Sequence, residues 1–261
     1  MSVVAGTVAR MDMVTGIRDA VAGRAAAWDF IRAFAAEWSA APLTERDGCG
    51  AGEIAAAEVR LGLPLPAALK EAYALLGQRP DLTDNHDALR PLAELEVETD
   101  ERGTALVFRD ENQGVCRWGI LLADPERAAD GGADGTDPDD PPVVVRLDLQ
   151  DTSEERWEPW LGRVSHCFVE IVLAESVHEP EELTAMLVDD EGEVGEVGEV
   201  GDLAAEEGLV RLPFPDYPPG DARPTRWYAG PDLLVRGDSV AYVRARTEEA
   251  LELFLGPDEE E

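Results

Sequence analysis

Glu58–Gly77, EVRLGLPLPAALKEAYALLG, contains two helix-forming segments separated by a short hinge with two prolines. Gly62 predicts the end of the first helix, and Pro66 suits the first position of the second helix, Ala67–Leu76. Gly77 is expected to terminate that second helix as a C′ glycine. No other stretch of the chain constrains the fold as specifically.

The chain before the hinge is also helical by its periodicity. Trp28–Trp38 (WDFIRAFAAEW) places its large apolar side chains near one helical face, which indicates an amphipathic helix that ends before Pro42. Ile54–Leu61 has apolar residues at helical offsets and leads into the hinge.

A β-hairpin is predicted after the hinge. Thr104–Phe108 (TALVF) is a compact apolar strand, and Cys116–Leu122 (CRWGILL) is the return strand. Asp110–Gly114 (DENQG), which lies between them, has the residues of a turn.

Three further elements are predicted around the hairpin. Glu94–Glu98 alternates apolar and acidic residues, and Val143–Leu149 is a second apolar strand. Val164–Ala174 is a helix by the spacing of its apolar residues, although its β-branched content is also compatible with a strand.

The end of the chain predicts a small β–α extension. Four short strands are expected, with a tight turn at 236–239 between the last two: Leu209–Leu212, Thr225–Ala229, Leu233–Val235 and Val240–Arg244. Thr247–Leu255 follows as a helix, for which Thr247 is the expected N-cap.

The order of these elements indicates an α+β fold. N-terminal helices are expected to pack on a central, mostly antiparallel sheet, with the C-terminal extension following it. The predicted segments are a weakly ordered or helical start (1–27), the main α+β domain (28–176), an acidic Gly-Glu-Val linker (177–207), an extension that could pack on the main domain (208–256) and an acidic tail (257–261). The tandem GEVGEVGEVG of 192–201 favours a mobile linker, because its glycines disfavour regular structure and its glutamates repel one another.

The formal net charge of −34 excludes several classes of partner. A field of one sign repels nucleic acid and acidic membranes and steers basic proteins, so neither a nucleic-acid nor a membrane partner is expected. At 44% hydrophobic residues the chain can still bury a core, and no apolar run is long enough to span a membrane. Its start lacks the apolar stretch of a signal peptide, and its three cysteines do not indicate a disulfide framework, so the expected location is the cytoplasm.

An ordered series of motifs starts with the helices and hinge of 54–77 and continues through LRPL at 89–92, LVF at 106–108, ENQG at 111–114, WG at 118–119 and the stretch 137–143. With this series, residues 28–176 resemble the SUKH superfamily, whose members look like the fungal Smi/Knr cell-wall regulators. The chain departs from many relatives after the second helix, where Gly77-Gln78-Arg79-Pro80 stands in place of Asn-Gly-Gly.

The resemblance implies an α+β scaffold that binds proteins and has no catalytic residues. Bacterial members of the family are mostly immunity proteins that bind and block toxins, often nucleases, whereas others are general interaction modules. The chain is therefore expected to be an immunity protein that occludes a basic, nuclease-like toxin. The alternative is a housekeeping interaction or regulatory module with no toxin partner.

The candidate partner-binding residues lie at the predicted hairpin tip and in a tryptophan pair, WEPW, near a surface loop. They are Glu111, Asn112, Gln113, Trp118, Trp157 and Trp160. The tip could instead be plain turn chemistry in which Asn112 bonds its own backbone, and both tryptophans of the pair could be buried. If exposed, the pair would be an anchor of the kind that dominates interfaces.

No catalytic, metal or cofactor site is expected. The histidines and cysteines lack the spacing of a zinc site, and no phosphate-binding glycine motif follows a strand. His166 and Cys167 are adjacent, which directs them to different faces of a helix and indicates a packed pair rather than a catalytic dyad.

Overall fold

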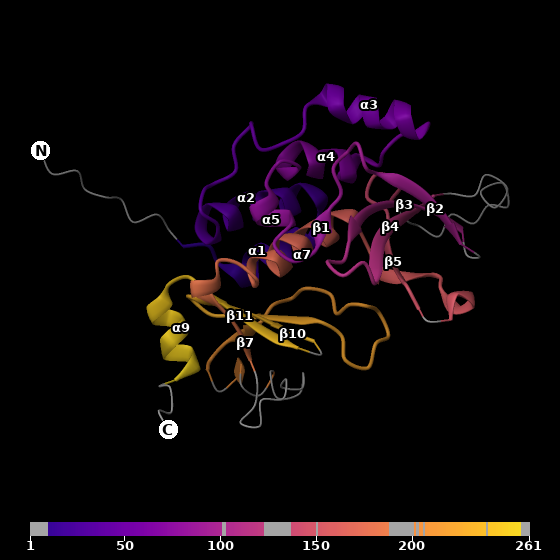
Figure 1. Ribbon diagram of the computed structural model, residues 1–261. Coiled ribbons are helices and arrows are strands. Elements are labelled where there is room, and N and C mark those ends of the chain that lie inside the picture. The colour runs from indigo at the N-terminus through magenta and orange to yellow at the C-terminus, as the bar shows by residue number, and fades with distance from the viewer. Residues whose placement is uncertain are drawn as a thin grey trace, which may run out of the picture.

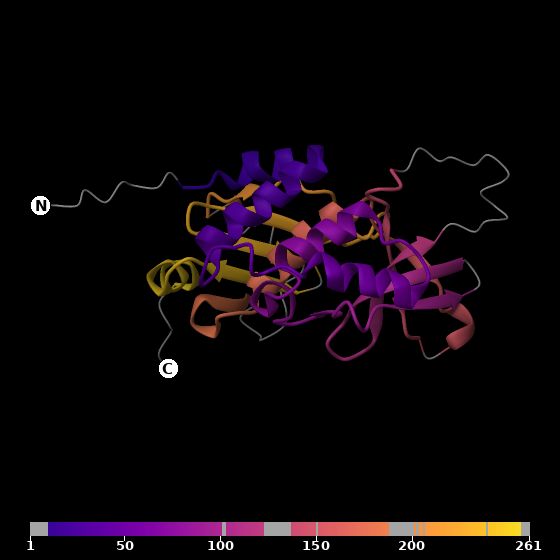
Figure 2. The same cartoon turned by 90° about the horizontal axis from the view of Figure 1, so that it is seen from above.

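The computed structural model has two antiparallel sheets and a central helix, α7 (Val164–Ser176), with α2 and α4 above that helix and the second sheet below it in the view of Figure 1. Figure 2 shows the same layers from above. The structure describes residues 10–100, 103–122, 137–149, 151–187, 201, 204–205, 207–238 and 240–256, apart from the side chains of Asp100 and Thr152. The α+β prediction is confirmed by this arrangement.

The predicted helices are all present: α4 has the predicted bounds, α2 and α3 begin earlier than expected, and α7 ends two residues later. α2 begins at Arg24 rather than Trp28, and a further helix, α1, lies within the segment expected to be weakly ordered or helical. Asp12 caps α1 by accepting two backbone N–H groups of its first turn, and Thr247 caps α9 as predicted. The helices are α1 (Met13–Ala22), α2 (Arg24–Trp38), α3 (Ala51–Leu61), α4 (Ala67–Leu76), α5 (Pro80–Thr83), α7 (Val164–Ser176) and α9 (Glu248–Leu255), with short 3₁₀ turns η1 (Thr152–Glu154) and η2 (Glu181–Leu183).

The first sheet has the strand order β1-β3-β4-β5-β6, and β2 also pairs with β3. β3 and β4 form the predicted hairpin, and β5 follows at the predicted place. β6 is not predicted from the sequence, because Pro159 is unusual within strands; β6 lies at the edge of the sheet, where proline is tolerated. The strands are β1 (Ala88–Leu89), β2 (Glu96–Asp100), β3 (Gly103–Asp110), β4 (Cys116–Leu122), β5 (Val143–Leu147) and β6 (Trp157–Leu161).

The second sheet has the strand order β7-β11-β10-β9-β8 and contains the four strands predicted for the extension. β7 comes from the segment predicted as a linker and pairs with β11. Most of the Gly-Glu-Val repeat, 192–200, lies outside the described residues. The strands are β7 (Thr184–Leu187), β8 (Val210–Arg211), β9 (Arg226–Ala229), β10 (Leu233–Gly237) and β11 (Ala241–Ala245).

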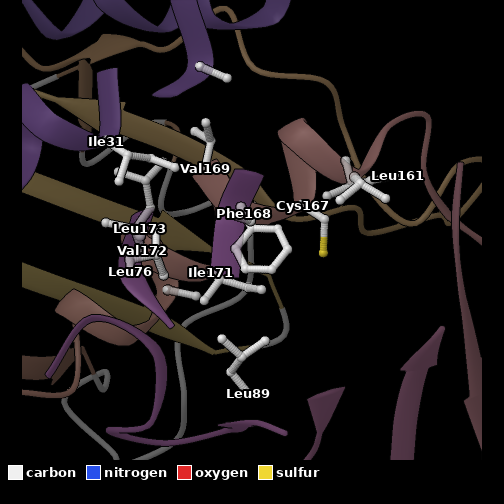
Figure 3. Close-up of a cluster of buried hydrophobic side chains, with 14 of the residues drawn as sticks. Ile31, Leu76, Leu89, Leu161, Cys167, Phe168, Val169, Ile171, Val172 and Leu173 are labelled. Atoms are coloured by element: carbon white, nitrogen blue, oxygen red, sulfur yellow. The ribbon is translucent and has the colours of Figure 1, made fainter. Parts of the chain in front are cut away.

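Every residue of α7 is buried, which places this helix at the centre of the main hydrophobic core (Figure 3). The ring of Phe168 contacts those of Phe108, Trp28 and Tyr73, at centroid distances of 5.9, 6.3 and 6.5 Å. The helical prediction for 164–174 is confirmed. A helix that is buried on all sides needs no amphipathic stripe, which explains why the same sequence was compatible with a strand.

The extension shares this core with the main domain. Its contributing side chains are Leu212, Phe214, Tyr217, Trp227, Ala229 and Leu234. A separate, smaller apolar cluster joins Val235 and Val243 of the second sheet to Leu251 of α9. The second sheet is therefore apolar on both faces, and one of those faces packs on the main domain.

Glu58 ties the hinge between α3 and α4 together. Its carboxylate accepts the backbone N–H of Leu65 at 2.9 Å and the ammonium of Lys70 at 3.3 Å. The hydrogen bond from Leu65, together with the contact to Lys70, lowers the pKa of Glu58. Gly62 has the left-handed φ of 71° expected at a helix end. Gly77 ends α4 as predicted, but its φ is −65°, so the prediction of a left-handed C′ glycine at that position is wrong.

The loop before α3 lies so close to α4 that two glycines are needed for space. A Cβ on Gly77 would come within 2.8 Å of Cys49 Sγ, and one on Gly48 within 1.7 Å of the carbonyl oxygen of Ala74. The backbone N–H of Cys49 donates to the carbonyl of Tyr73 at 2.8 Å, which holds the loop in this position. Gly77 is thus explained by packing rather than by backbone conformation.

Replacing Gly48 by alanine should destabilise the fold by roughly 2–4 kcal/mol, because the added methyl group overlaps a backbone carbonyl that cannot move alone. The matched control is Gly52→Ala on α3, where a Cβ meets no atom within 4 Å. That variant should be neutral or more stable by up to about 1 kcal/mol, since alanine favours helix over glycine. Urea unfolding followed by tryptophan fluorescence measures both, and equal stabilities would contradict the close approach.

Candidate functional site

The hairpin tip between β3 and β4 is an ordered turn with exposed polar side chains. The carboxylate of Glu111 accepts the backbone N–H of Gln113 at 2.8 Å and of Val115 at 3.1 Å. Gly114 adopts a φ of 73°, which L-residues with a side chain rarely adopt. Asn112 and Gln113 are exposed. The turn is therefore capped by Glu111, and not by Asn112 as one of the sequence alternatives had it.

Asn112 ties the tip to the loop that precedes β1. Its side-chain nitrogen lies 3.1 Å from Nδ1 of His86, and its backbone N–H donates to the carboxylate of Asp87 at 3.3 Å. These contacts join segments that are far apart in the sequence. The position of the tip thus depends on the position of the 85–87 loop.

A buried carboxylate on α7 holds that loop. Glu175, whose side chain is 1% exposed, accepts the backbone N–H groups of Asn85, His86 and Asp87 at 2.8, 2.6 and 3.3 Å. Three donors on one carboxylate satisfy much of the hydrogen bonding that it loses on leaving water.

The guanidinium of Arg109 is the centre of the buried charges. It pairs with Glu175 at 2.7 Å, Glu170 at 3.0 Å and Asp87 at 3.3 Å, and its own side chain is 1% exposed. Burial alone would lower the pKa of Arg109, but the neighbouring carboxylates raise it above its ordinary value. Burial raises the pKa of Glu170, and Arg109 opposes that shift. Arg109 also lies over the ring of Trp118 at 4.7 Å, so an aromatic face helps to cover the cation.

The second sheet completes the network from the other side. The hydroxyl of Tyr217 donates to Glu170 at 3.3 Å and accepts the indole N–H of Trp227 at 3.0 Å. Trp160 packs between Tyr217 and Trp118, with ring centroids 5.1 and 5.8 Å away. A continuous chain of contacts therefore runs from the second sheet through α7 and Arg109 to the tip.

The six candidate residues of the sequence analysis do not form one surface. Glu111, Asn112 and Gln113 share the tip, and Trp118 lies behind it, buried under Arg109. Trp157 is 1% exposed and packs with Ala105, Val107 and Val144, whereas Trp160 is half-buried against the main core. Residues three positions apart in a strand face opposite sides of the sheet, so the pair is divided between two faces and does not form one exposed anchor.

Sequence reasoning missed Arg109, Glu170 and Glu175, which support the tip. The available signal was a charged residue inside an apolar element: an arginine directly after the TALVF of β3, and two acids within the apolar α7. Charges in such positions are rarely buried unless they are paired. Their mutual pairing could not be read from the chain, because Arg109 is 61 and 66 residues from its partners on α7.

His166, Cys116 and Cys167 are packed side chains. Nε2 of His166 lies 3.1 Å from the carbonyl oxygen of Val21, and burial lowers the pKa of this histidine. Burial raises the pKa of the thiols of Cys116, to about 12, and of Cys167, so both are protonated at neutral pH. Within the described ranges, no three His, Cys, Asp or Glu side chains are grouped so that they could hold a metal ion.

No protein-family model matches the chain, and no curated protein or solved structure is significantly similar to it. In the part of the chain that the structure describes, no helix has the length and apolarity needed to cross a bilayer.

Replacing Arg109 by methionine should destabilise the protein by about 3–5 kcal/mol, because the carboxylates on α7 would stay buried without their cation. Arg32→Met is the matched control: its ion pair with Asp29 is mostly exposed, and its loss should cost less than about 1 kcal/mol. Chemical denaturation of both variants provides the comparison. If both variants lost a similar amount of unfolding free energy, the buried ion pairs of Arg109 would contribute no more to stability than the exposed pair of Arg32.

Proposed function

We propose that this chain is a non-catalytic, protein-binding domain of the SUKH immunity type that blocks a basic, nuclease-like toxin by occlusion. The observation that carries the proposal is the tip at residues 111–115, an exposed turn supported by a buried charge network. Interaction surfaces commonly combine such exposed loops with rigid support beneath them.

Apolar side chains beside the tip add contact area for a partner. Val115 and Leu147 are each 50% exposed, and Leu149 is 39% exposed. They lie together because Cys116 pairs with Leu147 in the sheet, and the N–H of Asp148 donates to the carbonyl of Val115 at 2.8 Å. An apolar patch with polar groups at its rim is typical of a protein–protein contact.

The charge of the chain favours a basic partner. A net charge of −34 attracts a positively charged domain over long distances and raises its rate of association. Nucleases that bind the phosphate backbone expose basic side chains in their substrate path, which makes them electrostatically complementary to this protein. The proposal includes a cytoplasmic location, where such a toxin would meet its substrate.

Binding to a toxin domain encoded next to this protein tests the proposal. Asn112→Ala, Gln113→Ala and Leu147→Ser should each weaken binding by roughly 10- to 100-fold if these side chains contact the partner. The control is Leu253→Ser on α9, where an 84% exposed leucine lies on a different element and its loss should change the affinity less than about twofold. Isothermal calorimetry measures the affinities, and inhibition of toxin activity reports occlusion.

Two results would count against the proposal. Absence of binding to every co-encoded toxin would exclude the immunity role and favour the housekeeping interaction module. Tight binding that none of the tip substitutions weakens would place the contact elsewhere on the molecule.

A further inference from the structure

Two histidine rings lie face to face next to the buried charge network. The rings of His86 and His178 have centroids 4.0 Å apart and planes inclined by only 7°. His86 belongs to the loop that Glu175 holds, and His178 follows the end of α7. Tyr242 of β11 lies beside His178 at 4.8 Å, so the stack connects this loop to the second sheet.

His86 also contacts the tip, next to Asp87, which accepts the backbone N–H of Asn112. Its Nδ1 lies 3.1 Å from the side-chain nitrogen of Asn112. The outer ring of the stack therefore touches Asn112, while the inner ring is packed against β11. A change in the charge of the inner ring would act on the tip through one intermediate side chain.

Charged groups from every neighbouring element surround the stack. Arg109 of β3 forms ion pairs with Asp87, Glu170 and Glu175. Arg236 of β10 forms an ion pair with Asp238, which follows that strand. Tyr242 is the titratable group of β11 at the stack. Both arginines disfavour a further positive charge on His178, while Asp238 favours it.

His178 is placed to remain neutral at physiological pH. Its Nε2 atom is buried and has no hydrogen-bond partner among the described residues. Burial, followed by the neighbouring His86 and the two arginines, lowers the pKa of His178 to about 4. An ordinary histidine in an unfolded or opened chain has a pKa of about 6.5.

The direction of the pH effect follows from this difference. The opened form binds a proton more tightly than the closed form, so closure is fully favoured above pH 6.5 and loses stability as the pH falls toward 4. Between pH 6.5 and pH 4, the ratio of open to closed forms increases by up to about tenfold for each unit that the pH falls.

We infer that the His86–His178 stack is a proton-sensitive latch, which holds the tip in place at neutral pH and releases it in acid. Protonation of His178 places a third cation beside Arg109 and Arg236, and moving the loop outward hydrates that charge. Asn112 then loses its contact with His86. The inference rests on the proposed function only in taking the tip as the partner-binding surface.

Hydrogen exchange in the free, full-length protein tests the latch. The readout is the exchange of the backbone amides of Asn85, His86 and Asp87, measured by NMR at pH 7 and pH 5 and corrected for the intrinsic rate. Between these pH values the opening constant should rise by about 20-fold in the wild type. It should change less than about twofold in His178→Phe, which keeps a flat ring in the stack but cannot bind a proton.

A second variant keeps the test decisive if His178→Phe does not fold. His86→Gln alters an exposed side chain, removes the stacking partner and should raise the pH at which the ring resonance of His178 titrates. His166, which lies outside the stack, is the internal reference and should titrate identically in both proteins.

The latch is overturned if the loop amides of wild type and His178→Phe show the same pH dependence, or if His178 titrates near pH 6.5 in the wild type. Because these measurements need no partner, they stand even if no toxin binds the protein. If the latch and the proposed function are both correct, the toxin affinity of the wild type falls from pH 7 to pH 5 and that of His178→Phe does not.

Discussion

The ion pairs of Arg109 connect the parts of this protein that matter for its candidate site. One guanidinium meets two buried carboxylates from α7 and a mostly buried one from the loop before β1. Removing charges from water is costly, and a buried pair repays that cost only with close geometry and further hydrogen bonds. The carboxylates meet both conditions, because Glu175 also accepts three backbone N–H groups and Glu170 accepts the hydroxyl of Tyr217. Hydrophobic residues could have filled the same volume without fixing one orientation of α7 against β3.

The orientation of α7 against β3 determines where the exposed hairpin tip lies. The same carboxylate that pairs with Arg109 holds the 85–87 loop, and this loop in turn contacts Asn112 at the hairpin tip. An exposed turn usually samples many conformations, and ordering it during binding costs free energy. Here much of that ordering is already provided by groups inside the fold. The His86–His178 stack lies on the same path, which is why a proton on a partly buried ring could alter a surface that it does not touch.

Local patterns in the sequence were sufficient for most of the secondary structure. The hairpin of β3 and β4, the helix α4 and the strands of the extension each have a period or a turn signal that does not depend on distant contacts. The features that the sequence did not predict depend on contacts with other parts of the chain. β6 contains Pro159, which is tolerated because the strand lies at an edge, and β7 is a short strand that exists because β11 offers a pairing partner. Gly77 does end α4, but a glycine is needed there for the packing of Cys49 and not for a left-handed backbone.

The sequence by itself determined the α+β class, the helix–hinge–helix of Glu58–Gly77 and the turn at Asp110–Gly114, since each follows from residue types a few positions apart. Only the tertiary structure decided which polar residues meet. Arg109 lies more than sixty residues from Glu170 and Glu175, and no local period encodes that distance. The tertiary structure also divided Trp157 from Trp160, because the pleat of an unpredicted strand sends them to opposite faces. The hairpin tip could thus be predicted from the sequence. The residues that support it, and its link to His178, could be identified only from the tertiary structure.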